Sequence, residues 1–184
     1  GMADAAATAT GMGAVAASTM AFLQQGDHLL ASKAIYGCSF ALFNHMFARY
    51  GIEVSFVDMT DHAAVEQAIK PNTKMLFAET PINPNMVVLD LAFLADVCRQ
   101  HKLISVIDNT FMTPLLQKPA DYGIDIVIHS ATKYLNGHGD VVAGLIVSDS
   151  ETIKTIKLTT LKDMGATISP HDAWLIIRGL KTLS

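Results

Sequence analysis

The sequence predicts an α/β domain of three αβα layers, in which helices cover both faces of a mostly parallel sheet. Short apolar runs typical of buried strands alternate along the chain with longer segments of helical periodicity. The 184 residues are enough for one domain with its own core, and 51% hydrophobic against 16% charged residues indicate a globular chain.

The expected elements alternate between strands and helices. The strands are short, mostly apolar runs, as in sheets buried on both faces, and cover HLLAS (28–32), VSFVD (54–58), KMLFAE (74–79), LISVID (103–108), DIVIH (125–129) and VAGLIV (142–147). The helices are longer segments at residues 11–25, 36–49, 61–69, 90–101, 149–162 and 170–181. Asp61 is a suitable N-cap for the helix at 61–69. The run AAATAT before Gly11 is a poor strand sequence, so we expect no strand there.

Composition and charge argue against several classes of protein. The 13 Lys and Arg residues are scattered in a chain of net charge −4, so we expect no nucleic-acid partner. No apolar span approaches the roughly 18–20 residues of a membrane-spanning helix, and the first residues lack the features of a secretory signal. Cys38 and Cys98 have neither metal-site nor disulfide spacing, so we expect no metal and a reducing, cytoplasmic location.

Polar residues follow three of the expected strands. Glu79 ends one, Asp108 ends the next along the chain, and the cluster Ser130–Lys133 follows a third. Because ligands of open α/β sheets bind beyond the carboxyl ends of the strands, these residues are expected at one rim of the sheet. The sequence therefore groups them as one candidate site.

Several of these residues allow two interpretations each. Lys133 is suited to forming a Schiff base with a carbonyl group, or it could simply extend from a strand end into water. Ser130 and Thr132 could donate to phosphate oxygens or cap the following turn. Asp108, followed by Asn109-Thr110, could keep a pyridine nitrogen protonated, as pyridoxal 5'-phosphate (PLP) requires, or it could close an Asx-turn.

The glycines at the start of the first helix also allow alternatives. Gly11-Met12-Gly13 would let backbone N–H groups approach a phosphate at a helix N-terminus, or it could be an ordinary helix start. Residues 11–16 also match G-x-G-x-x-A, the dinucleotide fingerprint. That fingerprint needs a preceding strand and an acidic residue after the next strand, where we find Ala31-Ser32-Lys33, so a nicotinamide site is the weaker hypothesis.

Other candidate residues lie in loops and at helix starts. Tyr36 could stack on a cofactor ring and donate a proton, or be a half-buried aromatic residue. Cys38 could line the site or be a small core residue. Asn83, in the loop ETPINP after Glu79, could contact a cofactor ring or hold the turn. His138 and Asp140 lack further ligands at suitable spacing, so we interpret them as structural.

Together these motifs resemble a known family. The run SATKYLNGHGDVVAG (130–144) is similar to the PLP-lysine signature of the Cys/Met-metabolism enzymes, which include cystathionine γ-synthase, cystathionine γ-lyase, O-acylhomoserine sulfhydrylases and methionine γ-lyase. The similarity extends to TGMGAVAA, YGCSF, ETPINPN, DNTF and SPHDAWLIIRGLKTL, and so covers nearly the whole chain. YGC, with Cys38, and LKD followed by SPHDA resemble the methionine γ-lyase branch.

The resemblance implies a fold and a set of roles. The fold would be the large domain of PLP-dependent transferase fold type I. Lys133 would bind PLP covalently, Tyr36 would stack on the ring and protonate the leaving thiol, and Cys38 would line the substrate pocket. The implied cofactor-binding residues are Gly11, Met12, Tyr36, Asn83, Asp108, Thr110, Ser130, Thr132 and Lys133.

The implied reaction is γ-elimination of L-methionine to methanethiol, ammonia and 2-oxobutyrate. A cystathionine lyase or synthase, or a sulfhydrylase performing γ-replacement, is the alternative within the family, and a non-catalytic α/β module is the alternative outside it. The resemblance also implies a small sulfur amino acid as substrate and a homo-oligomer, a dimer or tetramer.

The resemblance bears on the extent of the domain. It implies that residues 1–184 are the PLP-binding large domain, with an N-terminal arm and a C-terminal domain outside them. Ala9-Thr10 stands where the family usually has Ser-Ser. Because the family's substrate-carboxylate arginine lies in the C-terminal domain, we expect weak or no γ-lyase turnover from these residues alone.

Overall fold

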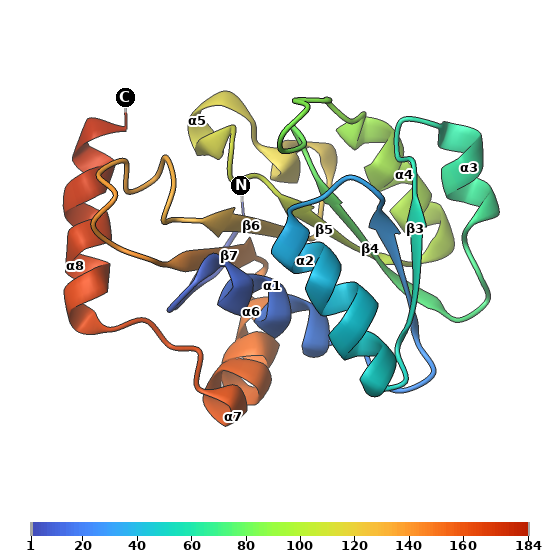
Figure 1. Ribbon diagram of the computed structural model, residues 1–184, viewed down its shortest axis with the longest axis horizontal. Coiled ribbons are helices and arrows are strands. Elements are labelled where there is room, and N and C mark those ends of the chain that lie inside the picture. Colours follow the sequence, from blue (N-terminus) through green and yellow to red (C-terminus); the bar gives the residue numbers. More distant parts are fainter. Residues whose placement is uncertain (1, 184) are drawn as a thin grey trace.

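The computed structural model describes residues 2–183, and these build a seven-stranded sheet between two layers of helices (Figure 1). The strands are β1 (Asp4–Thr8), β2 (His28–Ser32), β3 (Glu53–Val57), β4 (Thr73–Glu79), β5 (Ile104–Asp108), β6 (Ile126–Ser130) and β7 (Gly144–Ser148). Their spatial order is β1-β7-β6-β5-β4-β2-β3. β2 to β6 pair in parallel, and β7 pairs antiparallel with both β6 and β1. The predicted α/β class with a mostly parallel sheet is confirmed.

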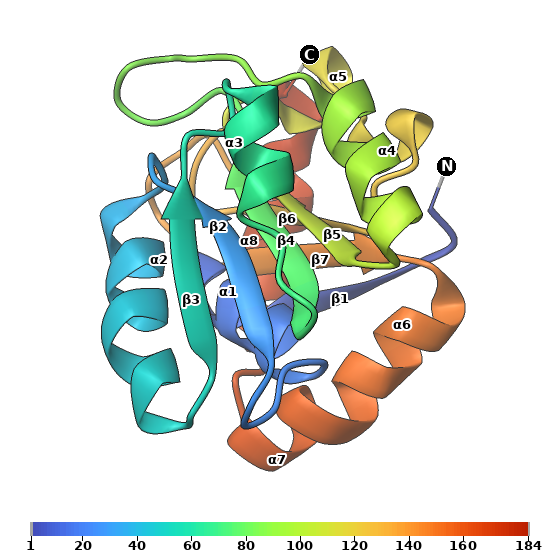
Figure 2. The ribbon, with the colours of Figure 1, turned by 90° about the vertical axis from the view of Figure 1, so that its right-hand side faces the viewer.

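The helices divide between the two faces of the sheet. The main ones are α1 (Gly11–Met20), α2 (Gly37–Ala41) with the π-helical turn η1 (Leu42–Phe47), α3 (His62–Gln67), α4 (Leu91–His101), α6 (Ser150–Ile156) and α8 (Pro170–Gly179). Shorter ones are α5 (Thr113–Leu116), η2 (Pro119–Tyr122), η3 (Lys157–Leu161), α7 (Lys162–Met164) and η4 (Leu180–Thr182). Residues from α1, η1 and α6 share one core with the sheet, and those from α3 and α4 share the other (Figure 2).

The two cores explain why the strands are so apolar. Leu29 and Phe77 lie in the core under α1, whereas Leu30 and Leu76, their neighbours along the strands, lie in the core under α4. Because successive side chains point to opposite faces, a strand covered on both sides needs apolar residues at nearly every position. Among residues 2–183, no helix combines the length and the apolar character needed to cross a membrane.

Two sequence expectations differ from the structure. The run before Gly11 is a strand, β1, because it pairs with β7 along its whole length. The first helix ends at Met20 rather than at residue 25, because the carboxylate of Asp27 accepts the N–H of Gln24 at 3.0 Å and closes a turn there. The presence of β1 does not support a nicotinamide site. The dinucleotide fingerprint belongs to a βαβ unit with neighbouring strands, whereas four strands separate β1 from β2 in the sheet.

Candidate active site

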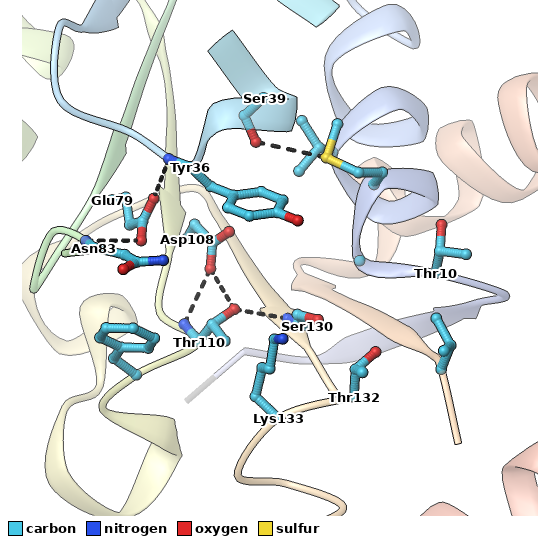
Figure 3. A pocket seen from close by; sticks show the side chains of 15 residues that line it. Thr10, Tyr36, Ser39, Glu79, Asn83, Asp108, Thr110, Ser130, Thr132 and Lys133 are labelled. Atoms are coloured by element: carbon cyan, nitrogen blue, oxygen red, sulfur yellow. Dashed lines mark hydrogen bonds between the residues drawn. The ribbon is translucent and has the colours of Figure 1, made fainter. Parts of the chain in front are cut away.

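The strand ends surround a cavity of about 230 Å³ at the carboxyl rim of the parallel strands. The residues that the sequence assigns to the cofactor all line it, and these are Gly11, Met12, Tyr36, Asn83, Asp108, Thr110, Ser130, Thr132 and Lys133. Figure 3 shows the labelled side chains facing this space from the ends of several elements. The roles assigned to these residues stay predictions, but the structure brings the residues together.

One wall of the cavity is the N-terminus of α1. Thr10 caps this helix by accepting the N–H of Gly13 at 2.7 Å, whereas the N–H groups of Gly11 and Met12 have no hydrogen-bond partner within residues 2–183. A Cβ atom on Gly11 would lie 2.8 Å from Oγ of Ser130, so only glycine lets the helix approach the end of β6 this closely. Free N–H groups at a helix N-terminus favour an anion such as phosphate.

The floor of the cavity is a hydrogen-bonded network across β5 and β6. Oδ1 of Asp108 accepts the N–H of Thr110 at 3.0 Å and its hydroxyl at 2.5 Å. Oγ1 of Thr110 in turn accepts the N–H of Ser130 at 2.7 Å. Burial raises the pKa of Asp108, and the two hydrogen bonds from Thr110 lower it. This network holds one oxygen of a half-buried carboxylate that has no salt bridge within residues 2–183.

Lys133 and Thr132 lie in the turn that follows β6. The N–H of Lys133 donates to the carbonyl of Ser130 at 3.1 Å, and the N–H of Gly137 donates to the carbonyl of Lys133 at 2.8 Å. Thr132 is held by Ala143, whose N–H donates to Oγ1 at 3.0 Å. The backbone on both sides of Lys133 is therefore fixed, while its amine makes no ion pair within residues 2–183. Such an amine is available to a carbonyl group.

The opposite wall carries Tyr36, which precedes α2. Its side chain is 44% exposed and faces the cavity above Asp108 (Figure 3). A hydrogen bond with Cys38 is the largest cause that raises the pKa of Tyr36. Cys38 itself is exposed and is not among the residues that line this cavity. Its assignment to the substrate pocket stays a prediction.

Sequence reasoning did not assign Ser39 or Phe111 to the site, and it grouped Glu79 with the rim residues without giving it a role, yet all three line the cavity. Glu79 did have a signal, because it ends an apolar strand at the same rim as Asp108. Burial, and then the charge of Asp108, raise the pKa of Glu79 to about 7. Ser39 and Phe111 had no such signal, because their places depend on how α2 and the loop after β5 pack.

The turn that contains His138 and Asp140 has structural contacts. The side chain of Asn136 donates to Oδ1 of Asp140 at 2.8 Å, and Arg178 on α8 forms an ion pair with Asp140. Nδ1 of His138 lies 2.6 Å from the carbonyl oxygen of Asn136. Within residues 2–183 no group of three or more His, Cys, Asp or Glu side chains is arranged to hold a metal ion.

The residues that line the cavity have the chemical groups that PLP needs. Only glycine fits at position 11 beside Ser130, which leaves room and free N–H groups for a phosphate. The half-buried carboxylate of Asp108 and the amine of Lys133 line the same space. These groups match the phosphate, ring nitrogen and aldehyde of PLP, so the residues fit this cofactor.

Comparison with known proteins agrees with this chemistry. The chain is 48% identical over 181 residues to an L-methionine gamma-lyase of Porphyromonas gingivalis and 42% identical over 183 residues to an O-succinylhomoserine sulfhydrylase of Pseudomonas aeruginosa. These matches cover 97% and 100% of this chain but 45% of each relative, so the chain spans about half the length of the curated relatives it matches.

A solved structure matches the fold closely. The crystal structure of cystathionine gamma-lyase from Lactobacillus plantarum, complexed with L-serine, superposes with a TM-score of 0.95 at 39% identity, covering 99% of this chain and 48% of that one. The family model described as Cys/Met metabolism PLP-dependent enzyme matches residues 1–184. The chain therefore belongs to the family of PLP-dependent enzymes of Cys/Met metabolism.

Proposed function

We propose that residues 1–184 form the PLP-binding large domain of a carbon–sulfur lyase that catalyses γ-elimination of L-methionine to methanethiol, ammonia and 2-oxobutyrate. The observation that carries the proposal is the convergence of Lys133, Asp108 and the N-terminus of α1 on one cavity. The similarity to L-methionine gamma-lyases supports the choice of substrate.

Different residues of the cavity would bind different parts of the cofactor. The N–H groups of Gly11 and Met12, with the hydroxyls of Ser130 and Thr132, would bind the phosphate, since all four residues line the cavity and Gly11 lies against Ser130. Asp108 would pair with the ring nitrogen and keep it protonated. Once bound, PLP supplies an electron sink that stabilises negative charge at the carbon next to the amino group.

The remaining residues would move protons and orient the substrate. Lys133 would bind PLP covalently and, once displaced by the substrate's amino group, accept the proton from the α-carbon. Tyr36 would donate the proton of its hydroxyl to the departing sulfur atom, since Tyr36 lines the same cavity as Lys133. Asn83 would contact the ring's phenolic oxygen.

Covalent loading of Lys133 is the direct test. The purified chain is titrated with PLP, reduced with borohydride and digested, and the labelled peptides are mapped. We expect a visible absorbance band and label on Lys133, both lost in Lys133→Ala and both kept in the control Lys154→Ala, an exposed lysine of α6. Label scattered over surface lysines would instead favour a non-catalytic α/β module.

A second function within the family is γ-replacement. The similarity to an O-succinylhomoserine sulfhydrylase supports it. Because we expect little turnover from residues 1–184 alone, the substrates are added to a full-length version of the enzyme loaded with PLP. The substrates are methionine, cystathionine and O-acetylhomoserine, and O-acetylhomoserine is tested both with and without sulfide. The visible spectrum, the consumption of each substrate and the release of 2-oxobutyrate are followed. A γ-lyase releases 2-oxobutyrate from methionine without added sulfide. A sulfhydrylase consumes O-acetylhomoserine faster when sulfide is present.

We further propose that the protein works as a homo-oligomer, a dimer or tetramer, in the cytoplasm. Exposed apolar side chains on α8, Trp174 and Ile177, support a partner surface, because large apolar groups rarely cluster on one exposed helix face. Two free cysteines, Cys38 and Cys98, are compatible with a reducing compartment. Sedimentation velocity measures the oligomeric state, and a single monomeric species would contradict the first part.

A further inference from the structure

We propose that Glu79 is a positioning residue, whose carboxylate anchors Tyr36 and Asn83 over the cofactor ring and places a second negative charge beside Asp108. This inference rests on the proposed function, because it concerns how the PLP site is held in shape. Glu79 ends β4 and lines the cavity, but its carboxylate oxygens are directed at two backbone N–H groups (Figure 3).

One of the two hydrogen bonds joins segments that are far apart in the chain, and the other holds the loop that follows Glu79. Oε2 of Glu79 accepts the N–H of Tyr36 at 2.7 Å, and Oε1 accepts the N–H of Asn83 at 3.3 Å. Tyr36 belongs to the connection between β2 and α2, and Asn83 to the loop after β4. Glu79 is only 6% exposed, so water cannot replace these contacts readily.

Tyr36 has few other restraints. Its side chain is 44% exposed, so packing does not fix the ring, and it makes no side-chain cap to α2. Its carbonyl accepts the N–H of Phe40 at 3.0 Å, which ties it only to the helix that it precedes. The bond to Glu79 is thus the contact that ties the Tyr36 backbone to the sheet.

The negative charge of Glu79 also supports a role in cofactor binding. Glu79 and Asp108 are paired neighbours on β4 and β5, so two carboxylates lie side by side at the rim. Glu79 has no salt bridge to a Lys or Arg within residues 2–183. An anchor alone could use a neutral amide, and a buried carboxylate without a cation is unfavourable. A protonated ring nitrogen at Asp108 would offset both charges.

Two variants of Glu79 separate the anchor from the charge. Glu79→Ala removes both acceptors, whereas Glu79→Gln keeps one carbonyl oxygen for the N–H of Tyr36 and removes the charge. Glu66→Gln is the matched control, because Glu66 is an exposed carboxylate on α3. Amide exchange of Tyr36 is measured by NMR in the cofactor-free chain, relative to the buried Val106 amide of β5, so that a general loss of stability cancels.

We expect Glu79→Ala to speed exchange at Tyr36 about tenfold or more, and Glu79→Gln to change it less than about threefold. We expect both variants to weaken PLP binding about tenfold and to reduce the visible circular dichroism of each bound PLP, with Glu66→Gln unchanged. The inference would be overturned if the Glu79→Ala variant had the same exchange rate at Tyr36 and the same affinity for PLP as the Glu66→Gln control.

Failure of the inference and failure of the proposed function are distinguishable. If the wild-type chain does not load PLP on Lys133, the proposed function fails, and the proposed role of the Glu79 charge fails with it. Amide exchange at Tyr36 then still tests whether Glu79 holds the Tyr36 backbone in place. If the wild type loads PLP normally and the Glu79 variants bind it with unchanged affinity and dichroism, only the inference fails.

Discussion

The hydroxyl of Thr110 joins Asp108 to β6, and its removal gives a prediction that the structure makes quantitative. Oγ1 of Thr110 donates to Asp108 at 2.5 Å and accepts the N–H of Ser130 at 2.7 Å. Thr110→Val keeps the shape of the side chain but loses both contacts. A hydrogen bond to a charged group contributes about 1.5–3 kcal/mol, and an unpaired N–H costs about 1 kcal/mol or more. We expect a loss of about 3 kcal/mol in unfolding free energy.

Urea unfolding measures this loss. With an m-value of about 2 kcal/mol/M, the expected loss corresponds to a midpoint lower by about 1.5 M. Thr159→Val is the matched control, because the exposed hydroxyl of Thr159 donates only to the carbonyl of Thr155 on its own helix, at 2.7 Å. Its effect should stay within about 0.5 kcal/mol. A Thr110→Val midpoint equal to that of Thr159→Val would refute the reasoning.

The same substitution should also weaken PLP binding. The hydrogen bonds of Thr110 lower the pKa of Asp108 against the effect of burial, so removing the hydroxyl favours the protonated carboxyl group. A protonated Asp108 no longer pairs with a charged ring nitrogen. Fluorescence titration with PLP at neutral pH should therefore show a higher Kd for Thr110→Val than for Thr159→Val.

Three further predictions concern single residues. The pKa of Glu79 is raised from 4.5 to about 7, so the folded chain holds a proton that the unfolded chain releases, and unfolding free energy should fall as pH rises from about 4.5 to about 7. Urea titrations across this range should show a shallower fall in Glu79→Gln, and equal slopes would contradict the assignment. Gly11→Ala would place a Cβ atom 2.8 Å from Oγ of Ser130, so PLP titration should give a Kd about tenfold higher, with a normal far-UV spectrum. Ellman's reagent should modify the exposed Cys38 in the native chain but not Cys98, which is 2% exposed and has its pKa raised to about 12 by burial, until urea is added.

The elements that the sequence predicts well are those whose signal is local. β4 contains the apolar run at residues 75–78, β5 has three apolar residues of five, and Asp61 caps α3 by accepting the N–H of Ala64 at 3.0 Å. β1 was missed because an alanine-rich run has a low strand propensity, and its conformation comes from pairing with β7, about 140 residues away. The early end of α1 was missed because it depends on the side chain of Asp27.

The candidate site divides in the same way. The residues at strand ends could be grouped from the sequence, because parallel strands deliver their carboxyl ends to one rim. Asp108 and Lys133 follow that rule and line the cavity. Residues whose place depends on loop packing do not follow this rule, and the sequence therefore gives no signal for Phe111, which also lines the cavity.

The amino-acid sequence alone is enough to predict the α/β class, the alternation of elements and the set of strand-end residues, because periodicity and the polarity of strands are local properties of the chain. Which groups touch one another is seen only in the folded chain. The bond from Tyr36 to Glu79 and the network from Asp108 through Thr110 to Ser130 each join segments separated by 20 residues or more. Such contacts depend on register and on the close approach of backbones, which packing of the whole core sets.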